Sequence, residues 1–195
     1  MEHNLVPGRR GACLAALGLL AACTNRPPPP VVSLPMAPGF VLTDPVRQSI
    51  LHTGYAFATR GSMNGRPWEA AQAISEVEFL AVELDANQRW IEMSGLAKMA
   101  LVQARPEWRG ALGIAADAQP QAVIDAMTRV RLAYGAQDSA AAAVALQPPL
   151  FTPGGASGLA RLNELPPLPR TARAAMLAQQ ELMRMDSRNR RDDWQ

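Results

Sequence analysis

The chain has few side chains that could act as an acid, a base or a nucleophile. Its two histidines are His3 and His52, and Ser49 precedes His52 by three residues, about one helical turn. A serine nucleophile needs an imidazole to accept its proton and an acid to orient that imidazole. No particular acid is placed for this purpose, so we interpret His52 as a partly buried residue of a helix.

Three glutamates, Glu69, Glu76 and Glu83, recur every seven residues, which places them along one side of a helix. Paired carboxyl groups can cleave a glycosidic bond when one of them is held protonated. Helical lytic transglycosylases place a serine directly after the catalytic glutamate, whereas here Ser75 precedes Glu76 and Val77 follows it. We therefore interpret the three glutamates as part of a solvated polar face.

Aromatic side chains are the other candidates for binding. Trp68, Trp90 and Trp108 each lie near an expected helix start or turn, and Phe151 lies in a proline-rich segment. Tryptophan usually packs in a core, and this is our prediction for all three. If two tryptophans shared an exposed groove, they would instead favour binding of a sugar or of a partner protein.

The N-terminal residues have the order of parts found in export signals. Arg9 and Arg10 precede an uncharged apolar run at 11–20. A membrane-spanning helix needs roughly 20 apolar residues, whereas the apolar part of a secretory signal has roughly 7 to 15. The sequence therefore predicts a cleavable signal peptide at 1–22.

Leu20, Ala21, Ala22 and Cys23 resemble the lipobox of bacterial lipoproteins. This resemblance covers residues 1–23 and implies cleavage after Ala22, with acylation of Cys23, for example by palmitate. Two or more acyl chains make a stable anchor, because each buried methylene contributes about 0.8 kcal/mol. Thr24 stands where inner-membrane lipoproteins have Asp, which implies the periplasmic face of the outer membrane.

Several kinds of chemistry are excluded by what remains after cleavage. The other cysteine, Cys13, lies within the signal peptide, so no thiol besides Cys23 is left for a disulfide, a thiolate nucleophile or a zinc site. The glycine-rich segment 154–158 matches neither a phosphate-binding loop nor a nucleophile elbow. The formal net charge of the chain is only +2. We expect no cofactor, no metal and no nucleic acid partner.

Residues 23–43 are predicted to form a tether. Pro27 to Pro30 and two later prolines favour an extended polyproline II conformation. At about 3.1 Å per residue, residues 24–38 would reach roughly 45 Å from the membrane. The alternative is a proline-rich ligand for an aromatic groove of a partner.

Residues 44–186 show helical periodicity throughout and no strand-like alternation. The sequence predicts an all-α domain, an irregular bundle of about five or six helices behind the proline-rich tether, followed by a polar tail at 187–195. The expected helices are 45–60, 67–85, 88–105, 106–112, 119–134, 139–146 and 171–186. Pro106 is expected to end the third of these segments.

The sequence also shows apolar residues at helical spacing in two of these segments, and one irregular segment between helices. Ile74, Val77, Ala81 and Leu84 are expected to form a buried stripe. In the last helix, the apolar residues Ala172, Ala175, Met176, Leu182 and Met183 recur with helical spacing. Residues 147–169 contain six prolines and three glycines and are expected to form a long loop. We interpret this loop as a strap across the bundle, with a lid or a partner-docking loop as the alternative.

Two hypotheses of function follow. The first is a non-catalytic, lipid-anchored envelope protein that presents its helical domain to a protein partner in the periplasm. The second is a cell-wall glycan-binding or glycan-cleaving enzyme that uses Glu76 or Glu83 together with the tryptophans. The scarcity of clustered titratable residues favours the first hypothesis.

Overall fold

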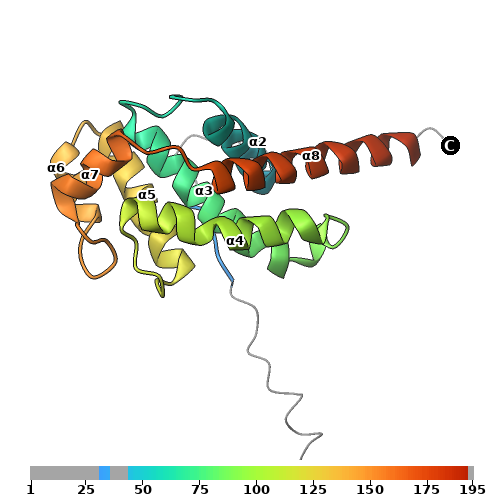
Figure 1. The fold of residues 1–195 in the computed structure, drawn as a ribbon, viewed down its shortest axis with the longest axis horizontal. Coiled ribbons are helices and arrows are strands. Elements are labelled where there is room, and N and C mark those ends of the chain that lie inside the picture. Colours follow the sequence, from blue (N-terminus) through green and yellow to red (C-terminus); the bar gives the residue numbers. More distant parts are fainter. Residues whose placement is uncertain (1–30, 36–43, 193–195) are drawn as a thin grey trace, which may run out of the picture. The chain divides into compact units, whose positions relative to one another are not determined.

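The computed structural model describes residues 31–35 and 44–192, and within these ranges the predicted all-α fold is confirmed (Figure 1). It contains seven α-helices and one short 3-10 helix. They are α2 (Pro45–Ala58), α3 (Pro67–Ala86), η1 (Gln88–Trp90), α4 (Gly95–Leu112), α5 (Pro120–Gly135), α6 (Ser139–Ala145), α7 (Gly155–Asn163) and α8 (Pro169–Asp192). The predicted signal peptide, the lipobox at Leu20 to Cys23 and most of the tether lie outside the described residues.

Helix starts follow the expected local signals. Pro45, Pro67 and Pro120 each occupy the first turn of a helix, where the missing N–H costs no hydrogen bond. The Asp44 carboxylate accepts hydrogen bonds from the backbone N–H groups of Val46 and Arg47 at 3.1 and 3.3 Å. This cap begins α2 at the residue that the sequence predicts.

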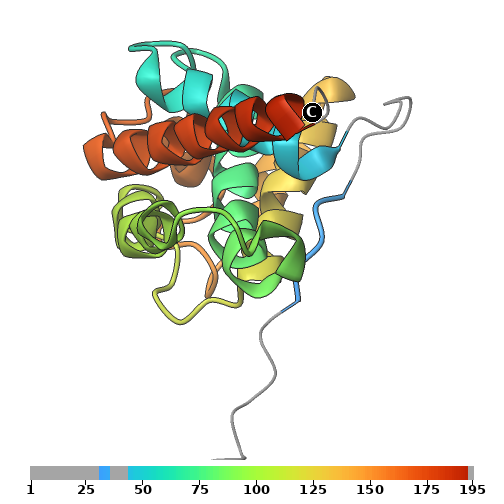
Figure 2. The same cartoon turned by 90° about the vertical axis from the view of Figure 1, so that its right-hand side faces the viewer.

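Helix α3 is the central helix of the bundle, and it packs against α2, α4, α5 and α7 (Figures 1 and 2). Fourteen of its twenty residues are buried. The predicted stripe of Ile74, Val77, Ala81 and Leu84 is confirmed, with at most 4% of any of these residues exposed. A helix enclosed on nearly all sides must also bury polar side chains, and Glu76 and Glu78 are among its buried residues.

Helix α8 packs against both α2 and α4. On the α4 side, the Glu107 carboxylate accepts hydrogen bonds from the backbone N–H groups of Arg170 and Thr171, at 3.1 and 2.7 Å. Near the other end of α4, the backbone N–H of Ser94 donates to Glu181 at 3.1 Å. The two contacts show that α4 and α8 run antiparallel, and the first also caps the start of α8.

The apolar residues of α8 that recur with helical spacing do not all face the core. Met176 is 45% exposed and Met183 is 54% exposed. Ala175 and Leu182, two residues of the predicted series, are buried, together with Ala174 and Ala178. Small side chains allow α8 to lie close to two neighbouring helices at once, which leaves the larger methionines on the outside.

The predicted helix end at Pro106 is also wrong, because α4 continues through this residue to Leu112. Pro106 is exposed, while Trp108 and Leu112 beyond it are buried. Their burial outweighs the cost of a proline within a helix, about 3 kcal/mol. The helix predicted at 88–105 is instead interrupted between η1 and α4. There the Ser94 hydroxyl caps the start of α4 by accepting a hydrogen bond from the backbone N–H of Leu96 at 3.2 Å.

The segment 147–169 is not one long loop, because its middle forms α7. Phe151 and Leu162 are buried, and the backbone N–H of Thr152 donates to the carbonyl of Gly113 at 2.7 Å. A side chain at Gly154 would lie 2.5 Å from the carbonyl oxygen of Leu146, so glycine is required for this close approach. These buried contacts agree with a strap held on the bundle.

The last helix is longer than expected. α8 extends to Asp192 and so includes most of the segment predicted to be a polar tail.

Among the described residues, none of the helices is both long enough and apolar enough to cross a membrane.

Candidate functional site

His52, the histidine in the part of the chain that the structure describes, lies between two carboxylates. His52 on α2 contacts Glu69 and Glu76 on α3: its Nε2 is 3.1 Å from Glu69 Oε1, and its Nδ1 is hydrogen-bonded to Glu76 Oε2. The Gln72 amide donates to Glu76 Oε1 at 3.0 Å. Glu76 is only 5% exposed, so the interpretation of a solvated acidic face is wrong for this residue, and acids do orient the imidazole.

The electrostatics of this cluster determine what His52 can do. Burial lowers the pKa of His52, but hydrogen bonds and charges from Glu76 and Glu69 outweigh burial and raise the pKa to about 9. At neutral pH both ring nitrogens therefore carry protons, and neither can accept one from a nucleophile. The Ser49 hydroxyl is buried and has no hydrogen-bond partner among the described residues. The cluster joins α2 to α3.

The raised pKa of His52 predicts a pH-dependent stability. Because the pKa rises from its ordinary 6.5 to about 9 on folding, the stabilising contribution is complete below pH 6.5 and is lost as the pH rises through 9. We expect the free energy of unfolding to fall by about 1–3 kcal/mol between pH 6 and pH 9.5. Urea unfolding at both pH values should give a much smaller fall in His52→Gln. An equal fall in the variant would contradict this assignment.

A second polar cluster is fully enclosed between α3 and α4. Glu78 has no exposed surface and accepts hydrogen bonds from Trp108 Nε1 at 2.8 Å and from Arg109 Nη2 at 2.5 Å. Arg109 is itself 5% exposed and also donates to the carbonyl of Ala116 at 2.9 Å. Arg105 Nε lies 3.3 Å from Glu78 Oε1. Arg105 Nε and Nη2 are buried without a hydrogen-bond partner among the described residues. The Glu78 carboxylate itself is occupied by Trp108 and Arg109, so the cluster links α3 to α4.

The predicted core packing is confirmed for two tryptophans. Trp90, Trp108 and Phe151 are at most 2% exposed, so these three do not form an open binding surface. Trp68 is 39% exposed, and its ring centre lies 5.9 Å from that of Tyr134. Trp68, Trp90, Trp108 and Phe151, the aromatic residues proposed from the sequence, line neither the groove between α4 and α8 nor the two cavities next to the turn at 59–65.

The surface between α4 and α8 has a groove of about 360 Å³. Leu96 and Ala100 of α4 and Leu177 of α8 contribute apolar side chains to it. Arg170 and Arg173 of α8 line the same groove, and neither side chain has a hydrogen bond or ion pair with the described residues. The groove therefore combines an apolar surface with two positive charges that have no partner among the described residues, and we take it as the candidate functional site.

Exposed apolar residues continue from this groove along α4. Leu96 is 60% exposed, Met99 51% and Val102 43%. These residues are not among the candidates predicted from the sequence, although their spacing of three residues indicates neighbouring positions on a helix. Helical spacing can reveal such a row, but only the structure shows that Leu177 of α8 lines the same groove as Leu96, with Arg170 and Arg173 toward the end of the groove near Gln103.

The described residues contain no group of three or more His, Cys, Asp or Glu side chains that could hold a metal ion. A scan against protein-family models and comparisons with curated proteins and solved structures found no match.

Proposed function

We propose that this protein is a lipid-anchored envelope protein without a catalytic site of its own, and that its helical domain binds another protein in the groove between α4 and α8. The anchoring part rests on the resemblance of Leu20 to Cys23 to a lipobox. The binding part rests on one observation, the pairing of an apolar groove with two arginines that have no side-chain partner in the described part of the chain.

The chemistry of the groove specifies the kind of partner. Leu96, Ala100 and Leu177 would bury apolar side chains of the partner, at about 25 cal/mol per Å² of apolar surface removed from water. An arginine guanidinium binds a carboxylate through two parallel hydrogen bonds. The partner segment should therefore carry apolar residues together with Asp or Glu.

The antiparallel register of the two helices gives the partner segment a direction. Leu96 lies near the Ser94–Glu181 contact, and Gln103 and Arg170 lie near the contact between Glu107 and the start of α8. The groove is therefore apolar toward the start of α4 and positively charged toward the start of α8. An amphipathic helix with apolar residues every three or four positions and acidic residues near one end would fit this pattern.

The alternative of a glycan-cleaving enzyme has less support. Glu76 is hydrogen-bonded to His52 and Gln72, and Glu83 accepts a hydrogen bond from the Asn87 amide at 2.7 Å. The three described cavities are lined by neither glutamate. A glycoside hydrolase needs two carboxyl groups on either side of an open sugar site. The arrangement of these side chains favours a binding protein.

Photo-crosslinking in intact cells tests the proposed groove. A photoreactive phenylalanine analogue replaces Leu96 in one variant and Val144 in a matched control, because Val144 is 69% exposed on α6 and does not line the groove. We expect a discrete protein product from position 96 only. Mass spectrometry of the crosslinked peptide should show a segment with apolar and acidic residues.

A charge reversal separates specific binding from random contact. Arg173→Glu, combined with the photoreactive residue at position 96, should reduce the yield of that product about tenfold or more, since it replaces attraction by repulsion. Equal products from positions 96 and 144, a crosslinked segment without acidic residues, or a yield unchanged by Arg173→Glu would contradict the proposal.

A further inference from the structure

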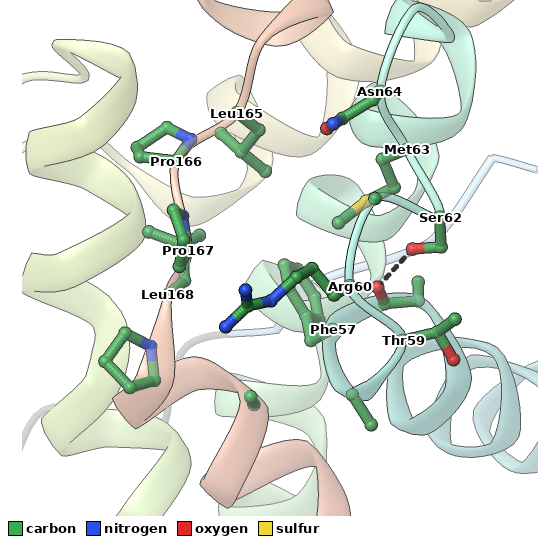
Figure 3. Close-up of a pocket in the computed structure, with 15 residues that line it drawn as sticks. Phe57, Thr59, Arg60, Ser62, Met63, Asn64, Leu165, Pro166, Pro167 and Leu168 are labelled. Carbon is green, nitrogen blue, oxygen red and sulfur yellow. Dashed lines mark hydrogen bonds between the residues drawn. The ribbon is translucent and has the colours of Figure 1, made fainter.

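A separate cavity of about 260 Å³ lies between the turn that follows α2 and the extended segment 165–169 that precedes α8 (Figure 3). Its apolar side chains include Phe57, Met63, Leu165 and Leu168. Met63 and Leu168 are at most 9% exposed, and the other two are partly buried. This cavity shares no lining residue with the groove between α4 and α8.

Both walls of this cavity are held in place by the fold. On one side, the Ser62 hydroxyl donates to the carbonyl of Ala56 at 2.6 Å, and the backbone N–H of Gly65 donates to the carbonyl of Asn163 at 3.0 Å. On the other side, Pro166 and Pro167 restrict the backbone of the extended segment. A preformed cavity binds a ligand without the cost of ordering its walls.

The Arg60 side chain gives the cavity its charge. It extends from the turn toward the proline-containing segment, so that its guanidinium lies between the two walls (Figure 3). Arg60 has no hydrogen bond or ion pair with the residues that the structure describes, and no acidic residue lines the cavity. Thr59 and Asn64 add a hydroxyl and an amide to the lining. The site therefore presents one uncompensated positive charge beside an apolar surface.

We propose that this cavity binds a small monocarboxylate, with its carboxylate on Arg60 and a compact apolar group against Phe57, Met63 and Leu165. The volume lies just below the range of roughly 300–1,000 Å³ that is typical of small-molecule pockets, so the ligand is about the size of one amino-acid residue. A single guanidinium matches one negative charge and pairs with a carboxylate through two hydrogen bonds. The same chemistry occurs in free organic acids and in the C-terminal residue of a peptide.

Calorimetric titration of the full-length protein in detergent tests this site, with N-acetyl-leucine as the probe and N-acetyl-leucinamide as its uncharged counterpart. We expect the acid to bind at least about tenfold more tightly than the amide, because only the acid can pair with the guanidinium. Arg60→Gln should remove this difference. Arg66→Gln is the matched control, since Arg66 is also exposed and does not line the cavity.

Two further probes distinguish the sources of the ligand. Binding of Ala-Ala-Ala-Leu with a free C-terminus, but not of its amidated form, would indicate a peptide terminus, and binding of N-acetyl-leucine alone would indicate a free acid. Either result supports the site if it depends on Arg60. No binding of either acid, equal binding of acid and amide, or equal losses in Arg60→Gln and Arg66→Gln would overturn the proposal. None of these outcomes depends on the groove between α4 and α8.

Discussion

Replacing Glu78 with alanine is expected to lower the free energy of unfolding by about 3–5 kcal/mol, as is typical when one partner of a buried ion pair is removed. The carboxylate has no exposed surface and accepts hydrogen bonds from Trp108 and Arg109. Without it, the Arg109 guanidinium, in a residue that is 5% exposed, would lose its buried counter-charge. Urea unfolding measures this loss directly.

Asp85→Ala is the matched control for this prediction, because Asp85 is an exposed acid on the same helix. The control should change the free energy of unfolding by no more than about 0.5 kcal/mol. If Glu78→Ala lost less than about 1 kcal/mol, or no more than Asp85→Ala, the ion cluster would not hold α3 and α4 together as described.

Replacing Cys23 with alanine is expected to move nearly all of the protein from the membrane fraction to the soluble fraction of lysed cells. The thiol is the proposed attachment point for the acyl chains, and none of the described helices is long and apolar enough to cross a membrane. Two or more acyl chains give stable anchoring, whereas a single chain gives only marginal binding. Quantitative immunoblots of the two fractions measure the change.

Cys13→Ala is the control for that substitution, because Cys13 lies inside the proposed signal peptide and would be removed with it. Its distribution between fractions should equal that of the natural sequence. A Cys23→Ala variant that stayed in the membrane fraction would show that another part of the chain provides the attachment.

The sequence predicted the helical architecture well because its signals are local. The cap at Asp44 and the buried stripe of α3 both follow from residues within one helix. Errors arose where distant packing decided the outcome. Pro106 continues a helix because Trp108 and Leu112 are buried beyond it, and α7 forms in a segment rich in proline and glycine where Leu162 reaches the core.

The polar clusters were harder to predict because they join residues from different helices. Glu69 and Glu76 are seven residues apart and contact the same histidine only because α2 packs against α3 in one register. Helical spacing alone cannot tell a carboxylate that faces a neighbouring helix from one that faces solvent. The groove was equally hard to predict from the sequence. Leu96 and Leu177 are 81 positions apart and line one surface only because α4 and α8 pack together.

The mass of the N-terminal peptide of the protein, purified from membranes, tests most directly whether this helical domain is presented from a lipid anchor. We predict a peptide that begins at Cys23 and carries a thioether-linked diacylglycerol, usually with a further acyl chain on its amino group. A peptide that begins before Cys23, or one in which Cys23 is unmodified, would contradict the lipid anchor and with it the proposed place of binding.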